Sequence, residues 1–433
     1  MIVNFSIENF GSIKDKQTLS FEATKSSHLE SQYIVNTGGV KLLKLALIYG
    51  ANASGKTTIL KALNFLRNMV LEPEGKKTNE LDFHPFLFDS QTPKQNAVIT
   101  ITFVQNEIRY YYEVEFSQKA IVAEKLDFFH PNKAGVFKRK TNLENQFTEI
   151  TFGSKIKIDK TSEKILESNT LWNNTVLGGF LKTNIELKEL KEATDWFKQY
   201  LKPLILTTTD LEGYVTSHID KSTISKENVV NILKKADFNI SDILIQEEER
   251  DIPEGFITFI ENQLNTPSDK INELKTKGRI TARKLTFEHT TEDNKKYTLL
   301  FDLESQGTKR YYGFAGILAL LIKNSVAFPI DELESSLHPE LYRHFLLSFL
   351  LNADKSQIIA TTHNREILDN RDMLRDDAIW ITDKDESCST TLYSLADFDS
   401  SVIRDTTNRL NVYKSGKLGG VPNLGDYYID IEK

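Results

Sequence analysis

The chain has 433 residues, of which 39% are hydrophobic and 27% charged, in the proportions of a folded globular protein rather than a disordered or collagen-like one. Its 54 Lys and Arg against 61 Asp and Glu give a net charge of -7, which argues against a non-specific nucleic-acid coat and confines any such contact to a local patch. One cysteine, Cys388, excludes a disulfide framework and a zinc site of several thiolates. We expect a cytoplasmic protein without a membrane segment, because no secretory signal is visible and the longest apolar stretch, 314–322, is short.

The first third of the chain predicts strands around one helix. Alternation at 2–9 and the stretch 17–23 predict two strands. An apolar run at 42–49 passes through a glycine-rich turn into a helical pattern whose apolar face carries Leu60, Leu63, Leu66 and Val70. Period-two stretches then predict consecutive antiparallel strands, at 97–103, 109–116 and 121–129.

The middle of the chain, from about 161 to 276, is charged and predicts mainly helices. One amphipathic helix there is expected to bury Trp196 and Phe197, as core residues rather than as a cofactor box. Strands and helices then alternate, with strands at 282–288, 297–303, 326–330 and 357–361 and helices at 308–323 and 339–351. The pattern predicts an α/β fold with a parallel sheet, formed by 1–160 and 279–433 and split by the helical insertion 161–278.

A phosphate-binding motif lies between the apolar strand and the first long helix. It comprises Gly50, Ala51, Asn52, Ala53, Ser54, Gly55, Lys56 and Thr57, with Thr58 following. Glycines let the backbone wrap closely round phosphates, and the helix presents its positive end to them. Lys56 brings a point charge to the β- and γ-phosphates and the Thr57 hydroxyl reaches Mg²⁺, so the motif predicts nucleotide binding.

An apolar strand at 327–330 ends in two acids, Asp331 and Glu332. In isolation such a run is typical of a solvated acidic turn, but a phosphate-binding loop in the same chain favours a catalytic pair. Asp331 would then hold Mg²⁺ and Glu332 would polarise the attacking water. Pro329 argues against a central strand, because it removes one ladder hydrogen bond.

Two further signals are weaker when taken alone. Ser305 and Gly307 lie in a turn before a helix, which is an anion site by the dipole argument, although Ser305 is also a typical N-cap. His363 follows the strand 357–361, and its place downstream of Asp331 favours a γ-phosphate sensor over a structural histidine.

The order of these four elements resembles the ABC-type ATPases of the SMC, RecF and OLD branch. Residues 330–339 look like the Walker B motif and D-loop of that branch. More narrowly, three pieces resemble the RloA-like bacterial ATPases, namely 5–15, 304–309 and 413–422. The resemblance covers roughly 1–150 and 280–425, and the middle of the chain carries no matching motif.

The resemblance implies a P-loop ATPase head with an antiparallel β subdomain, a helical insertion, and ATP with Mg²⁺ held between two subunits of a homodimer or higher oligomer. Lys56 of one subunit would face Ser305 and Gly307 of the other, Glu332 would be the base, and His363 would contact the γ-phosphate. Ser335 and Ser336 would transmit the state of one nucleotide site across the interface between the two subunits. The signature turn has one glycine where transporters have two, and the Q-loop glutamine has only the weak candidates Gln91 and Gln95.

Three functions follow as hypotheses. Relatives of this kind resemble the ATPase halves of anti-phage systems such as PARIS, so we expect an ATPase that controls a separate effector, a nuclease or toxin. A DNA-repair ATPase of the RecF or SMC kind is the alternative, supported by basic residues at 138–140 and at Lys275, Lys277, Arg279, Arg283 and Lys284, although the acidic balance disfavours nucleic acid. A nuclease in the same chain would need Asp383 and Asp385, which a hairpin turn explains better.

Overall fold

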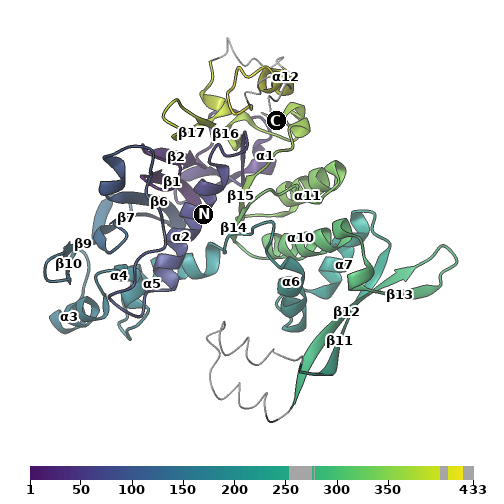
Figure 1. The fold of residues 1–433 in the computed structure, drawn as a ribbon, viewed down its shortest axis with the longest axis horizontal. Helices are drawn as coiled ribbons and strands as arrows, with labels where there is room; N and C mark the ends of the chain where they lie inside the picture. The colour runs from purple at the N-terminus through teal and green to yellow at the C-terminus, as the bar shows by residue number, and fades with distance from the viewer. Residues whose placement is uncertain (253–275, 277, 400–407, 423–433) are drawn as a thin grey trace, which may run out of the picture. The chain divides into compact units, whose positions relative to one another are not determined.

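The computed structural model describes residues 1–252, 276, 278–399 and 408–422 (Figure 1). The chain forms two compact units. Unit 1 comprises Met1–Thr209, Leu321–Ser335 and Phe345–Lys433, and unit 2 comprises Asp210–Leu320 and Ser336–His344. The division into 1–160, 161–278 and 279–433 stays a prediction, and residues 161–209 group with unit 1.

Unit 1 contains the expected antiparallel sheet, which has seven strands in the order β10-β9-β8-β7-β6-β1-β2. Its strands are β1 (Ile2–Glu8), β2 (Gln17–Ser20), β6 (Ala97–Gln105), β7 (Ile108–Phe116), β8 (Ile121–Phe129), β9 (Lys133–Asn142) and β10 (Phe147–Phe152). The second strand ends at Ser20, earlier than expected. Trp196 and Phe197 are fully buried as predicted, and the Trp196 ring stacks on Phe103 with centroids 4.2 Å apart.

The second sheet of unit 1 has the order β14-β15-β5-β16-β17, and all its pairs are parallel except β16 with β17. Its strands are β5 (Leu45–Gly50), β14 (Ala327–Ile330), β15 (Gln357–Thr361), β16 (Ile379–Lys384) and β17 (Thr390–Ser394). The apolar run expected as one strand at 42–49 is divided, because β4 (Val40–Leu43) pairs with β3 (Ile34–Thr37) instead. Pro329 is accommodated because β14 is the last strand of this sheet, beside which residues 201–205 form only isolated bridges.

The long helix of unit 1 is α2 (Lys56–Leu71), and its predicted apolar face, Leu60, Leu63, Leu66 and Val70, is buried. It contacts strands of both sheets, β1 of the first and β5, β14 and β15 of the second. The other helices are α1 (Glu30–Tyr33), α3 (Lys160–Asn169), α4 (Val176–Phe180), α5 (Lys188–Asp195), the π-turn η2 (Trp196–Tyr200) and α12 (Arg409–Lys414), with short 3-10 turns η1 (Thr92–Lys94), η4 (Glu366–Asp369), η5 (Asp376–Ala378) and η6 (Leu395–Asp397). Helix α2 begins just after the carboxyl end of β5, the middle strand of the parallel sheet.

The described part of unit 2 contains a sheet as well as helices. It contains α6 (Leu211–Asp220), α7 (Lys226–Lys235), a three-stranded antiparallel sheet of β11 (Ile240–Asp251), β12 (Arg279–Thr290) and β13 (Lys296–Leu300), and the turn η3 (Phe301–Leu303). Strand β11 was missed because its partner β12 lies far along the chain, so only tertiary pairing stabilises it. Helices α10 (Gln306–Lys323) and α11 (Pro339–Asn352) each pass from one unit to the other. No helix among the described residues is both long and apolar enough to cross a membrane.

Candidate functional site

The phosphate-binding loop joins the buried strand β5 to helix α2. Gly50 ends the strand at φ 156°, and the loop turns through left-handed residues Ala53 (φ 62°) and Gly55 (φ 102°) before Lys56 begins the helix. A Cβ at Gly55 would lie 2.1 Å from Thr390 Oγ1, so only glycine fits there. The loop thus has the strand–loop–helix form that directs backbone N–H groups and the helix dipole at an anion.

Residues that are distant in sequence hold the back of this loop. The hydroxyls of Ser54 and Thr382 are 2.6 Å apart, and Thr390 Oγ1 donates to the Ser54 carbonyl at 2.9 Å. Thr390 also bonds Ser12 Oγ at 2.8 Å. The sequence analysis missed Thr382 and Thr390, because small polar residues at strand ends carry no motif and their pairing is tertiary.

Lys56 is folded back onto its own loop. Its Nζ donates to the carbonyl oxygens of Gly50 and Ala51, each at 2.9 Å, and the residue is 6% exposed. Burial lowers the pKa of Lys56, while the carboxylates of Asp331 and Glu332 oppose that shift. The ammonium therefore lies at the centre of the loop, where it can bind an incoming anion.

Asp331 joins the loop to the neighbouring strand ends. Thr57 Oγ1 donates to its two carboxylate oxygens at 3.0 and 3.2 Å, and Thr361 Oγ1 donates to Oδ1 at 2.6 Å. A hydroxyl beside a carboxylate is a donor set that suits Mg²⁺. No group of three or more His, Cys, Asp or Glu that could hold a metal occurs among the described residues, so phosphate and water oxygens would complete the shell.

Glu332 follows Asp331 in a left-handed conformation with φ 46°, which costs about 1–3 kcal/mol for a residue other than glycine. Two hydrogen bonds hold it there: the Glu332 N–H donates to Thr361 Oγ1 at 2.8 Å, and the next N–H, of Leu333, donates to the Thr361 carbonyl at 3.1 Å. The side chain is left 45% exposed, so the turn presents the second carboxylate to solvent.

His363 lies close to Glu332, and its expected contact with the γ-phosphate stays a prediction. Its Nε2 is 3.9 Å from Glu332 Oε1, and its backbone N–H donates to Glu334 Oε1. The sequence analysis did not name Glu334 as a site residue. Its position two residues after Glu332 was the only sequence feature that pointed to it. Unit 1 therefore brings together Lys56, Thr57, Asp331, Glu332 and His363.

Ser305 and Gly307 belong to unit 2. Ser305 Oγ accepts the N–H of Thr308 at 3.0 Å, so this residue does cap α10. Gly307 lies in the first turn of α10 rather than before it, and a Cβ on Gly307 would be 3.6 Å from the carbonyl oxygen of Ser336, which belongs to the same unit. Their contact with nucleotide of another subunit stays a prediction.

The weak Q-loop candidates lie elsewhere in unit 1. Gln91 and Gln95 flank the turn η1, and the Gln95 carbonyl accepts from Asn9 Nδ2 at 2.9 Å. Residues 201–205 instead run parallel beside β14, and the Asp331 N–H donates to the Ile205 carbonyl at 2.8 Å. The polar residues 207–209 therefore follow a segment that ends beside Asp331. The sequence analysis missed this segment, although its short apolar run was a signal for an extended segment beside a strand.

Two of the described basic residues of the DNA-binding alternative, Arg139 and Arg279, lie beside acids, whereas Lys138 and Lys140 are exposed. Arg139 is 2% exposed with Glu124 at 3.7 Å, and Arg279 lies 3.4 Å from both Glu249 and Asp251. Lys275, Lys277 and the side chain of Arg283 lie outside the described residues. The described part therefore offers weak support for a basic patch at either group.

Asp383 and Asp385 lie in the expected hairpin between β16 and β17. Asp385 Oδ1 accepts the backbone N–H groups of Ser387 and Ser389, each at 2.9 Å. An aspartate that closes its own turn in this way explains the pattern without a nuclease.

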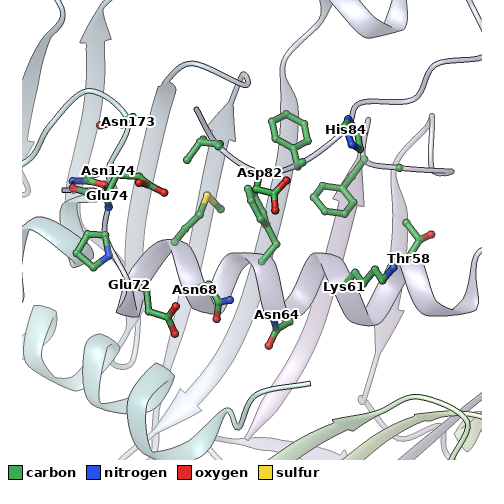
Figure 2. Close-up of a pocket in the computed structure, with 17 residues that line it drawn as sticks. Thr58, Lys61, Asn64, Asn68, Glu72, Glu74, Asp82, His84, Asn173 and Asn174 are labelled. Carbon is green, nitrogen blue, oxygen red and sulfur yellow. Dashed lines mark hydrogen bonds between the residues drawn. The ribbon is translucent and has the colours of Figure 1, made fainter. Parts of the chain in front are cut away.

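A pocket of about 600 Å³ extends along α2 from the phosphate-binding loop (Figure 2). Thr58, Lys61 and His84 lie at one end, and Glu72 and Asn174 lie at the other. Its apolar wall consists of Phe10, Phe65, Met69, Leu81 and Phe83. Three aromatic rings, those of Phe10, Phe65 and Phe83, thus form part of the wall.

The arrangement defines a P-loop nucleotide-binding protein, and sequence comparison places it in a family. Residues 45–369 match the family described as "AAA domain, putative AbiEii toxin, Type IV TA system". The match covers most of the chain, so the chain belongs to this family of AAA-type ATPase domains, and the expected ATPase family is confirmed. No curated protein sequence matches the chain.

Solved structures with a similar arrangement include the SMC head domain from Thermotoga maritima, which is 11% identical, covers 91% of this chain and 98% of its own, and has a TM-score of 0.42. A SmcHead bound to the C-winged helix domain of ScpA is 12% identical over 91% of this chain and 97% of its own, with a TM-score of 0.47. No argument about function follows from likenesses this distant.

Proposed function

We propose that this chain binds ATP with Mg²⁺ at the loop 50–57 and hydrolyses it to ADP and phosphate. The observation that carries the proposal is the meeting of Lys56, Thr57, Asp331, Glu332 and His363 at the ends of β5, β14 and β15. Carboxyl ends of neighbouring parallel strands share one edge, which is where α/β folds bind ligands. Membership of an AAA family supports the same activity.

Each side chain has a distinct role in the proposed reaction. Lys56 leaves the carbonyl oxygens of Gly50 and Ala51 and binds the β- and γ-phosphates. Thr57 and Asp331 would hold Mg²⁺, and the bound ion would supply positive charge against the phosphate oxygens. Glu332 accepts the proton of the water whose oxygen attacks the γ-phosphorus, and His363 contacts the departing phosphoryl group.

The aromatic pocket along α2 is a suitable place for the base of the nucleotide. It begins at Thr58, which directly follows the loop residues that bind phosphate, and its rings at Phe10 and Phe83 are 5.8 Å apart. Flat apolar walls favour a planar base, and Lys61 and His84 supply polar groups at the same end.

The larger role that we propose is regulation of an effector in anti-phage defence. Two subunits would enclose ATP, with Ser305 and Gly307 of one facing Lys56 of the other, and hydrolysis would reset the closed state. The family description, which mentions a putative AbiEii toxin and a type IV TA system, supports a role in a system of this kind.

Two variants test the ATPase assignment. Lys56→Ala should abolish ATP binding, because the loop loses its only buried cation among the described residues. Glu332→Gln should bind ATP, hydrolyse it at least about a hundredfold more slowly, and accumulate a dimer in light scattering. Hydrolysis by Glu332→Gln at the wild-type rate would show that another group is the base.

A further inference from the structure

The tail segment, residues 415–422, follows α12 and has no role in the site described so far. Gly416, Gly419 and Gly420 all have left-handed φ values, of 75°, 67° and 67°. Leu418 and Gly420 are buried, whereas Lys417 is exposed. A glycine-rich segment that is buried at its centre is packed against something specific.

Two tyrosine hydroxyls hold the tail segment in place. Tyr413 Oη donates to the Gly420 carbonyl and Tyr393 Oη, from β17, donates to the Leu418 carbonyl, each at 2.8 Å. Burial raises the pKa of both tyrosines to about 12, so both hydroxyls remain donors at neutral pH. The Tyr413 ring also packs edge-on against Tyr49, the residue before the phosphate-binding loop, with centroids 6.1 Å apart.

Gly420 lies directly against the base of that loop. A Cβ added to Gly420 would be 2.8 Å from Ile381 Cγ2, 3.2 Å from the Thr382 carbonyl oxygen and 3.3 Å from Gly50 Cα. Gly50 is itself packed closely against β16, because a Cβ added to Gly50 would be 2.3 Å from Thr382 Oγ1. Thr382 in turn bonds Ser54 and donates to the Tyr49 carbonyl at 3.1 Å.

We propose that residues 418–420 are a positioning segment for the phosphate-binding loop, which they support through Gly50 and Thr382. The two tyrosine bonds prevent the segment from moving away, so the start of the loop stays in the shape that receives phosphate. The inference rests on the proposed binding of ATP at this loop. It assigns a role in that site to the glycine-rich tail.

Gly420→Ala and Gly416→Ala form a matched pair for the test. Both place alanine at a left-handed φ and share that cost, but the methyl group at position 416 meets nothing within 4 Å, whereas at 420 it presses on Ile381 most closely and also on Thr382 and Gly50. We expect the KM for ATP to rise about tenfold in Gly420→Ala relative to Gly416→Ala, with kcat unchanged. Partial unfolding would instead lower the active fraction, and hence kcat, at an unchanged KM.

Tyr413→Phe provides a second test that does not crowd the site, because it removes only the hydroxyl that holds the Gly420 carbonyl. A raised KM for ATP at unchanged kcat is the expected result. Equal KM values for the two alanine variants, or for Tyr413→Phe and the wild type if Gly420→Ala does not fold, would overturn the inference. Failure of the wild type to bind a fluorescent ATP analogue would instead overturn the proposed function itself.

Discussion

Thr361 is the residue on which both acidic groups of the candidate site depend. Its Oγ1 donates to Asp331 Oδ1 at 2.6 Å and accepts the Glu332 N–H at 2.8 Å, and the residue is fully buried. One hydroxyl therefore orients the proposed metal ligand and supports the left-handed backbone of the proposed base. Its position at the last residue of β15 makes both contacts possible.

Thr361→Val should lower kcat for ATP hydrolysis by about tenfold or more, because a hydrogen bond to a charged group is lost. Valine keeps the shape, and Thr361→Ser, which keeps the hydroxyl, is the matched control. The Mg²⁺ concentration that gives half-maximal activity should also rise in the valine variant alone. Equal kinetics for the two variants would show that Thr361 has no role in positioning Asp331.

Lys44 allows a test of charge burial away from the site. Its Nζ donates to the carbonyl oxygens of Leu350 and Ala353, at 2.6 and 2.9 Å, beside the C-terminal end of α11. Burial lowers its pKa from 10.5 to about 8. Between those two pH values the unfolded chain binds the proton and the folded chain does not, so this group makes the free energy of unfolding rise with pH there.

We expect the free energy of unfolding of the wild type, relative to Lys44→Met, to increase as pH rises from about 8 to 10.5. Urea denaturation of both proteins at the two ends of that range measures the difference. Other groups that titrate in the same range cancel in the comparison. A difference that stays constant or falls with pH would contradict the lowered pKa.

At the scale of elements, the residues of the candidate site lie at the ends of parallel strands and at the starts of two helices. Strands β5, β14 and β15 deliver Gly50, Asp331 and Thr361 to one edge, while α2 delivers Lys56 and Thr57. Helix α10 begins at the capped turn of Ser305 in unit 2. At these positions a single substitution can change the ATPase activity without changing the stability, or the stability without changing the activity.

Ser305 is suited to such a separation. Ser305→Ala should cost about 1 kcal/mol of stability, because the N–H of Thr308 loses its acceptor. Ser305→Asn retains a capping oxygen and should unfold like the wild type, yet it should hydrolyse ATP more slowly if Ser305 reaches the nucleotide of another subunit. Chemical denaturation and steady-state kinetics on both variants measure the two effects, and full activity of Ser305→Asn would reduce Ser305 to a cap.

At the scale of the whole molecule, acidic residues lie beside the two described arginines of the basic groups, whereas Lys138 and Lys140 are exposed. The chain carries a net charge of -7. Arg279 on β12 lies beside Glu249 and Asp251 of β11, and Arg139 is buried near Glu124. These pairs reduce the positive potential that Arg279 and Arg139 themselves offer to a phosphate backbone.

Duplex DNA should therefore bind weakly at physiological salt, and Arg279→Glu should not change the affinity. Fluorescence anisotropy at low and physiological salt measures this, with Glu249→Gln as a variant that frees part of the Arg279 charge. Tight binding that falls steeply with salt and is lost in Arg279→Glu would support the DNA-repair alternative.

Much of unit 1 was predictable because its signals are local. The antiparallel strands β6, β7 and β8 and helix α2 show their own periods in the sequence, and the phosphate-binding motif requires a strand before it and a helix after it. Strand β11 was not predictable, since its stability comes from pairing with β12 at a distance along the chain. Thr361, Thr382 and Gly420 were missed for the same reason.

The sequence by itself determined that this chain has a P-loop, an acidic strand end and a strand-end histidine, because each is a short pattern whose chemistry depends on neighbouring residues. Only the tertiary structure decided which side chains meet: Thr57 with Asp331, Glu332 with Thr361, Ser54 with Thr382, and Gly420 with Gly50. Those contacts join segments up to several hundred residues apart. Strand order and packing bring such segments together, and no local pattern records either one.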